Sequence, residues 1–249
     1  MKKTLFTAFF ATAAALCPSV NAQDATANPD AEATEIWQAA AAKLEGAASL
    51  SATASLTYDV VQPSGRKLQF GAEYEIKAKR PNKFVADIAG DDGARRALYY
   101  DGAEIALVNL DEKLYATVAH EGSIESAIEV VLNKLNARMP LAALLRSNLR
   151  SILSGVFPDS AYIGAHEIGG VAADHVLLSN EYLDLQLWID AGEDAEVHKA
   201  LITYADFAAA PQFEASFDHW RFDKRIRDSE FTFEPDDSFE RIDFLETQD

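Results

Sequence analysis

Residues 67–80, KLQFGAEYEIKAKR, alternate between apolar and polar residues with almost no exception. Because successive side chains of a β-strand point to opposite faces, this pattern predicts a strand with one apolar face and one polar face. The segment is long, since strands usually run to about 5–6 residues. A long apolar face has to be covered in water, so the identity of its cover is the central question about this chain.

The same alternation appears before and after this segment. Residues 49–60 alternate as cleanly, and QPSGR at 62–66 is a turn by its proline and glycine. The two segments therefore predict a long antiparallel hairpin. Further strands are expected at 83–89, 95–100, 103–109, 113–119, 160–168, 171–179, 182–190, 197–206 and 212–222. In the last of these the apolar positions shift register near Asp218 and His219, which indicates a β-bulge.

Three segments carry apolar residues at helical spacing. The first is 34–45, which ends at Gly46, and the second is 123–136. The third begins near Pro140, a residue suited to a first helical turn, and continues to Leu153. Each segment has one apolar stripe, which has to be buried against another part of the fold.

These patterns together predict a mostly β, α+β fold. We expect a curved antiparallel sheet of about 11 strands that forms an incomplete barrel, because a sheet this wide twists and curls. About three helices are expected to cover its concave face, where their apolar stripes can be buried. The barrel is not expected to close, because the helices need access to the apolar face.

The N-terminus has the features of a secretory leader. Lys2 and Lys3 precede the apolar run TLFTAFFATAAAL, which is too short to span a bilayer, and VNA ends at Ala22. Residues 1–22 are therefore predicted to be a signal peptide that is cleaved on export to the periplasm. A lipid anchor on Cys17 is the alternative, but the residue before it is Leu16 rather than a small residue.

The remainder of the chain is predicted to be one domain. Residues 23–31 are small and polar and are expected to be flexible, and 32–249 are expected to form the half-barrel with a helical lid inserted at 123–154. The formal net charge of −18 makes nucleic acid an improbable partner, since phosphate binding needs a basic surface. No later segment approaches a membrane span. We expect a monomer with transient partners in the cell envelope.

No motif of a common enzyme class is found in the sequence. It has no G-x-S-x-G, no H-E-x-x-H, no calcium-loop pattern and no glycine-rich phosphate loop. The only cysteine lies in the leader, and the five histidines lack short metal-ligand spacing. We therefore expect a non-enzymatic protein with no metal and no cofactor.

Two segments resemble known families. Residues 77–118, with the motif R-P-N-x-F at 80–84, resemble the lipoprotein-carrier family LolA, and LQLWIDAGEDAEVHKALITY resembles the uncharacterised predicted periplasmic proteins of domain-of-unknown-function family 2092, which share a LolA/LolB-like fold. The resemblance implies a half-barrel with helices as a lid over an apolar cavity. It also implies that Arg80, the arginine of the motif, holds the lid shut. The alternative is that Arg80 only ends a strand before Pro81.

The apolar faces of the predicted elements supply candidate ligand contacts. The residues expected to line the cavity are Leu56, Tyr58, Leu68, Phe70, Tyr74, Ile76, Phe84, Leu98, Tyr100, Ile128 and Leu132. The favoured function is a periplasmic carrier or chaperone that binds a lipid, an acyl chain or a lipidated protein. The alternative is a structural or protein-interaction domain whose cavity is filled by its own helices, and a hydrolase with dispersed Ser or Asp catalysts has no motif in its support.

Overall fold

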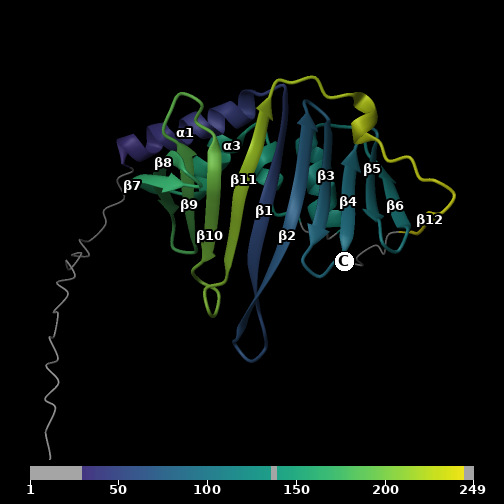
Figure 1. Cartoon of the computed structure of the whole chain (residues 1–249), viewed down its shortest axis with the longest axis horizontal. Helices are drawn as coiled ribbons and strands as arrows, with labels where there is room; N and C mark the ends of the chain where they lie inside the picture. The colour runs from purple at the N-terminus through teal and green to yellow at the C-terminus, as the bar shows by residue number, and fades with distance from the viewer. Residues whose placement is uncertain (1–29, 136–138, 244–249) are drawn as a thin grey trace, which may run out of the picture.

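The computed structural model describes residues 30–135 and 139–243 of the 249-residue chain (Figure 1). The predicted signal peptide at 1–22, with Cys17, lies outside the described residues. The same holds for all of the predicted flexible segment 23–31 except its last two residues.

Within the described residues, twelve strands form one open sheet (Figure 1). Their order across the sheet is β12-β6-β5-β4-β3-β2-β1-β11-β10-β9-β8-β7, and all neighbours are antiparallel except β12 and β6. The strands are β1 (Ser49–Val61), β2 (Lys67–Lys79), β3 (Lys83–Gly90), β4 (Arg95–Tyr100), β5 (Glu104–Asn109), β6 (Leu114–Ala119), β7 (Asp159–Ile168), β8 (Val171–Ser179), β9 (Leu183–Asp190), β10 (Val197–Tyr204), β11 (Gln212–Phe222) and β12 (Glu240–Arg241). The expected fold class is confirmed, with a twelfth, parallel strand added.

The opening hairpin lies at the centre of the sheet. β1 and β2 pair over their whole length, with Leu56 opposite Ala72 and Tyr58 opposite Phe70. β1 also pairs with β11, so the first and the last long strands of the chain are neighbours. The predicted bulge is present: Thr53 pairs with Asp218 and Ser51 with Arg221, and His219 has a positive φ of 56°.

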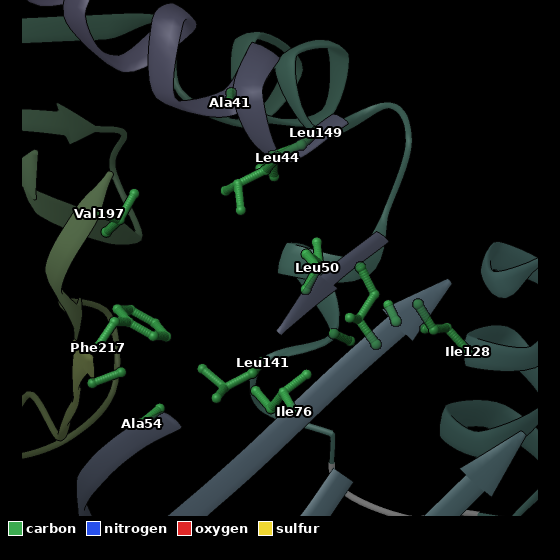
Figure 2. Close-up of a cluster of buried hydrophobic side chains, with 14 of the residues drawn as sticks. Ala41, Leu44, Leu50, Ala54, Ile76, Ile128, Leu141, Leu149, Val197 and Phe217 are labelled. Atoms are coloured by element: carbon green, nitrogen blue, oxygen red, sulfur yellow. The ribbon is translucent and has the colours of Figure 1, made fainter. Parts of the chain in front are cut away.

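Helix α1 (Ala31–Gly46) covers one end of the concave face, over β7, β8 and β9. Asp30 caps its first turn by accepting from the Glu32 amide, and the same carboxylate accepts from the Tyr162 amide of β7, which ties the helix to the sheet edge. Figure 2 shows Ala41 and Leu44 of α1 together with Leu149 of α3 (Leu149–Val156), directed toward Leu50 of β1. This apolar layer is the helical cover that the long strands required.

The helical insert after β6 is less regular than expected. Instead of one α-helix at 123–136, α2 (Ile124–Glu129) continues as a π-helical turn, η1 (Val130–Lys134). The predicted helix from Pro140 to Leu153 is divided into a 3-10 turn, η2 (Ala142–Leu145), and α3. It breaks where Arg146 adopts an extended conformation and where Ser147 donates to Glu125 of α2. Polar contacts to a neighbouring element therefore override the helical periodicity of the sequence.

The C-terminal segment crosses from β11 to the opposite end of the sheet (Figure 1). The 3-10 turn η3 (Asp228–Phe231) is held by ion pairs of Asp228 with Lys79 at 2.6 Å and of Glu230 with Lys77 at 3.0 Å. Phe231 is fully buried. The segment ends in β12, where the Ile242 amide donates to the Tyr115 carbonyl of β6. The sequence analysis did not predict η3 or β12.

None of the helices in the described ranges is both long and apolar enough to cross a bilayer.

Candidate functional site

A cavity of about 1190 Å³ lies on the concave face of the β1–β6 half of the sheet. It is larger than the roughly 300–1,000 Å³ of a typical small-ligand pocket. Most of its lining residues are apolar, and they come from the sheet, from the lid at 123–154 and from the β10–β11 turn. The cavity opens at a mouth formed by the β3–β4, β5–β6 and β10–β11 turns, where Asp92, Glu112 and Phe207 line it and are exposed.

Six of the eleven predicted residues line this cavity: Leu56, Tyr58, Phe70, Tyr74, Leu98 and Leu132. Tyr58 and Phe70 are cross-strand partners, and their ring centroids are 5.9 Å apart in a stacked arrangement. On the other neighbouring strand of β1, Phe213 of β11 pairs with Tyr58. These three aromatic residues form a continuous row across β11, β1 and β2. The geometry makes the six residues available to a ligand, and their role as ligand contacts stays a prediction.

Four other predicted residues lie deeper, in the packed core. Ile76, Phe84, Tyr100 and Ile128 are at most 3% exposed. The rings of Phe84 and Tyr100 are 5.6 Å apart, and the Tyr100 hydroxyl donates to the Gly122 carbonyl just before α2. Ile76, Phe84 and Tyr100 share the apolar face of the sheet with the cavity, whereas Ile128 belongs to α2 and packs in the same core cluster. They are not among the lining residues of the cavity.

Leu68 departs from the expectation. It lies at the start of β2, next to the β1–β2 turn, where it is 47% exposed and outside the cavity lining. The hairpin extends beyond the rest of the sheet at this end (Figure 1), so no second layer covers it. The alternation predicts on which face of the sheet Leu68 lies, but it does not show how much of that face the helices cover.

Several cavity residues were not predicted. Leu135 and Met139 contribute from the lid, Phe207 from the β10–β11 turn, and Ile242 from the residue after β12. The apolar turn sequence FAAAP at 207–211 is a signal that could have identified Phe207. No periodic pattern marks Ile242, because β12 contains only two residues.

Arg80 lies between the lid and α1 and donates to both. Its Nε donates to the Ala47 carbonyl at 3.1 Å and its Nη2 to the Leu44 carbonyl at 2.9 Å, at the end of α1. On the lid side, Nη1 donates to the Leu145 carbonyl and Nη2 to the Arg146 carbonyl at 3.3 Å. Burial lowers the pKa of Arg80, while Glu125 and Glu45 act in the opposite direction. The contact from Arg80 to lid carbonyls is therefore present, and its role as a latch remains a hypothesis.

A second polar contact joins two parts of the lid. Glu125 of α2 accepts from the Ser147 amide at 2.9 Å and from the Ser147 hydroxyl at 2.7 Å. Burial alone would raise the pKa of Glu125, but the hydrogen bonds from Ser147 and Ser123 outweigh it and lower the pKa to about 2. Glu125 is therefore charged over the whole neutral range.

In the two described ranges, no three His, Asp or Glu side chains gather in a way that could hold a metal ion.

Residues 33–245 match the family model described as Predicted periplasmic protein (DUF2092). The chain belongs to this family. The resemblance stated from the sequence is thereby confirmed. The description also agrees with the location expected from the leader, and this DUF2092 protein is periplasmic. A search of curated proteins found no match.

Solved structures similar to this DUF2092 protein share little sequence with it. An uncharacterized conserved protein from Thermus thermophilus has 9% identity and a TM-score of 0.47, over 85% of this chain and 99% of that one. Lipoprotein LppX from Mycobacterium tuberculosis has 14% identity and a TM-score of 0.45, over 80% and 98%. A LolA superfamily protein from Nitrosomonas europaea has 10% identity and a TM-score of 0.37, over 81% and 97%. At these values, none of the three indicates what this chain binds.

The Glu125–Ser147 contact makes the stability of this DUF2092 protein depend on pH. Because the folded state lowers the pKa of Glu125 from 4.5 to about 2, the contact stabilises fully above pH 4.5 and is lost as the pH falls from 4.5 toward 2. In Glu125→Gln we expect an unfolding free energy about 1 kcal/mol below that of the parent at pH 7, after allowance for solvent screening. Denaturant melts of both proteins at pH 7 and pH 3 measure this difference. A difference that is the same at both pH values would contradict the assignment.

Proposed function

We propose that this protein is a non-enzymatic periplasmic carrier or chaperone that holds the apolar chain of a lipid, an acyl group or a lipidated protein in the cavity. The observation that supports this best is the cavity itself, an open apolar volume of about 1190 Å³ on the concave face of a rigid sheet. Burial of a hydrocarbon chain contributes about 0.8 kcal/mol per CH₂. The acyl chain of a lipid would therefore supply ample binding free energy.

The position of the helices supports the proposal. α1 packs over the β7–β9 end of the sheet, α3 packs against α1, and Ile124, Ile128 and Val131 of the lid are buried in the apolar core. Among the described residues of the lid, only Leu132, Leu135, Met139 and Pro140 line the cavity. The helices therefore border the cavity but do not fill it, which favours the carrier over a domain whose cavity is self-filled.

The polar contacts of the lid suit a cover that moves. Arg80 and Glu125 hold the lid through hydrogen bonds to backbone carbonyls and to Ser147, in addition to apolar burial. Because folding exchanges hydrogen bonds with water for these contacts, each contributes only about 1.5–3 kcal/mol even with a charged partner. A lid held partly in this way can be displaced by a ligand whose own burial replaces the lost contacts.

The proposal predicts binding of a neutral apolar probe to delipidated protein. We expect one molecule of N-phenyl-1-naphthylamine to bind each chain with increased fluorescence, and uncharged twelve-carbon amphiphiles to displace it below their micelle-forming concentrations. Fluorescence titration and native mass spectrometry measure the affinity and the stoichiometry. If the delipidated protein binds neither the probe nor the amphiphiles, the carrier proposal fails and the protein-interaction alternative becomes the better one.

A further inference from the structure

We infer that the ligand is an amphiphile with an anionic head, a carboxylate or a phosphate, and that Arg96 binds this head at the mouth of the cavity. This inference rests on the proposed function and adds the polar part of the ligand. Arg96 is the only cationic residue among the described residues that line the cavity. It is the second residue of β4, next to the β3–β4 turn, so it lies at the mouth end.

The strand register places the Arg96 side chain on the concave face. Arg96 lies opposite Ile88 of β3, and Ile88 lies opposite Tyr74 of β2. Both Ile88 and Tyr74 line the cavity. Burial raises the pKa of the Tyr74 hydroxyl and nearby Tyr58 raises it further, while the charge of Arg96 acts to lower it. Arg96, Tyr74 and Tyr58 thus line the same cavity, with Arg96 and Tyr74 in one row across β4, β3 and β2.

Arg96 and Tyr74 have hydrogen-bonding capacity that the described part of the chain does not use. Neither side chain takes part in any of its side-chain hydrogen bonds or salt bridges. A guanidinium carries five N–H donors in a planar fork that matches a carboxylate or phosphate. An anionic head would satisfy this fork, and the Tyr74 hydroxyl would add a further donor.

Four of the five carboxylates in the described lining are engaged, and the fifth, Asp243, follows β12 at the end of the described residues. Asp59 forms an ion pair with Lys67 at 2.9 Å, and Asp91 accepts from the Gly71 amide at 2.7 Å. Asp92 accepts from the Ala94 amide within its own turn, and Glu112 accepts from the Asn109 side chain. The contacts of Asp91, Asp92 and Glu112 lie in turns of the mouth, which is the usual place of such residues, and the ion pair of Asp59 joins β1 to β2. Asp59, Asp91, Asp92 and Glu112 therefore have a structural explanation, whereas Arg96 and Asp243 have none among the described contacts.

The inward-facing positions of β4 also give the ligand an orientation. Along this face, Arg96 is exposed, Leu98 is 7% exposed and Tyr100 is fully buried. Polarity therefore falls from the mouth toward the lid within five residues of one strand. A head bound at Arg96 directs its chain past Leu98 and toward Leu132 of the lid, which both line the cavity.

Arg96→Gln tests the inference with twelve-carbon ligands that differ only in the head. Dodecanoate, dodecyl phosphate, 1-dodecanoylglycerol and dodecylammonium each displace the neutral probe N-phenyl-1-naphthylamine from delipidated protein at low salt. In the parent we expect one or both anions to bind at least about tenfold more tightly than the neutral ligand. Arg96→Gln should remove this preference and leave the neutral ligand within about twofold of its parent affinity. The two anions distinguish a carboxylate head from a phosphate head.

Arg95→Gln is the matched control. Arg95 is the neighbouring residue on β4, exposed, and paired with Ala89 on the opposite face of the sheet. Arg95→Gln removes the same charge outside the cavity, so the preference for anions should persist. The inference is overturned if dodecylammonium binds more tightly than the anions, if Arg96→Gln weakens all ligands equally, or if Arg95→Gln has the same effect. If neither the neutral probe nor any of the amphiphiles binds, the proposed function is overturned together with this inference.

Discussion

Arg80→Leu is expected to release the lid from the body of the protein. The substitution removes the donor to four backbone carbonyls, two at the end of α1 and two at the start of the η2–α3 connection. Hydrogen bonds from a charged donor contribute about 1.5–3 kcal/mol each, and the carbonyls would stay partly buried without a partner. We expect the described lid amides at 123–135 and 139–154, and the last turn of α1, to exchange about a hundredfold faster. Hydrogen–deuterium exchange with mass spectrometry measures this region by region.

Two variants make this result specific. Arg80→Lys keeps the charge but not the planar fork, so it should restore only part of the protection. Arg95→Leu removes an exposed arginine of the same sheet and should leave the lid unchanged. If Arg80→Leu lowers the melting temperature but accelerates exchange equally in all strands, Arg80 is a general structural residue and the latch hypothesis is wrong.

Ala72→Trp is expected to abolish ligand binding without unfolding the protein. Ala72 lines the cavity on β2, between Leu56 of β1 and Gly90 of β3, so an indole at this position occupies space that a chain would use. Displacing four methylenes from the cavity costs about 3 kcal/mol, which weakens binding more than about a hundredfold. Because the indole enters open space, overpacking is avoided and the melting temperature should change little. Titration with the neutral probe measures the loss.

The matched control is Ala89→Trp. Ala89 lies on the adjacent strand β3, is exposed, and pairs with Glu73, whose side chain is on the polar face. The same substitution there should leave probe affinity unchanged. Full affinity in Ala72→Trp would show that the ligand does not occupy the cavity beside β2.

The strands could be predicted closely because alternation is the direct result of burying one face of a sheet. β1 to β11 all lie within two residues of their expected ends, and the bulge at His219 follows from the change of register in its strand. The lid was predicted less well, because Arg80 and Glu125 impose contacts on it that periodicity does not contain. β12 pairs through two residues, too few to show a period.

The sequence predicted which side of the sheet the cavity residues face, but not how deeply each of them is buried. Alternation placed Tyr74, Ile76 and Tyr100 on one face, but it does not contain the packing of the lid, so it could not show that Tyr74 borders the cavity while the other two are in the core. Arg96 was missed although the sequence contains a signal for it. It occupies the same alternating face as Leu98, so it is a charge at a position where the pattern requires an apolar residue. Such an exception is often a functional position.

The pairing of β1 with β11 makes the centre of the sheet depend on residues far apart in the sequence. β2 follows β1 directly, but the other edge of β1 has no partner until residues 212–222 are available. Contacts this distant in sequence make folding slow, and an unpaired central edge can associate with other chains in the meantime. A chain truncated before β11 therefore lacks the central partner of β1 and not a strand at the edge of the sheet.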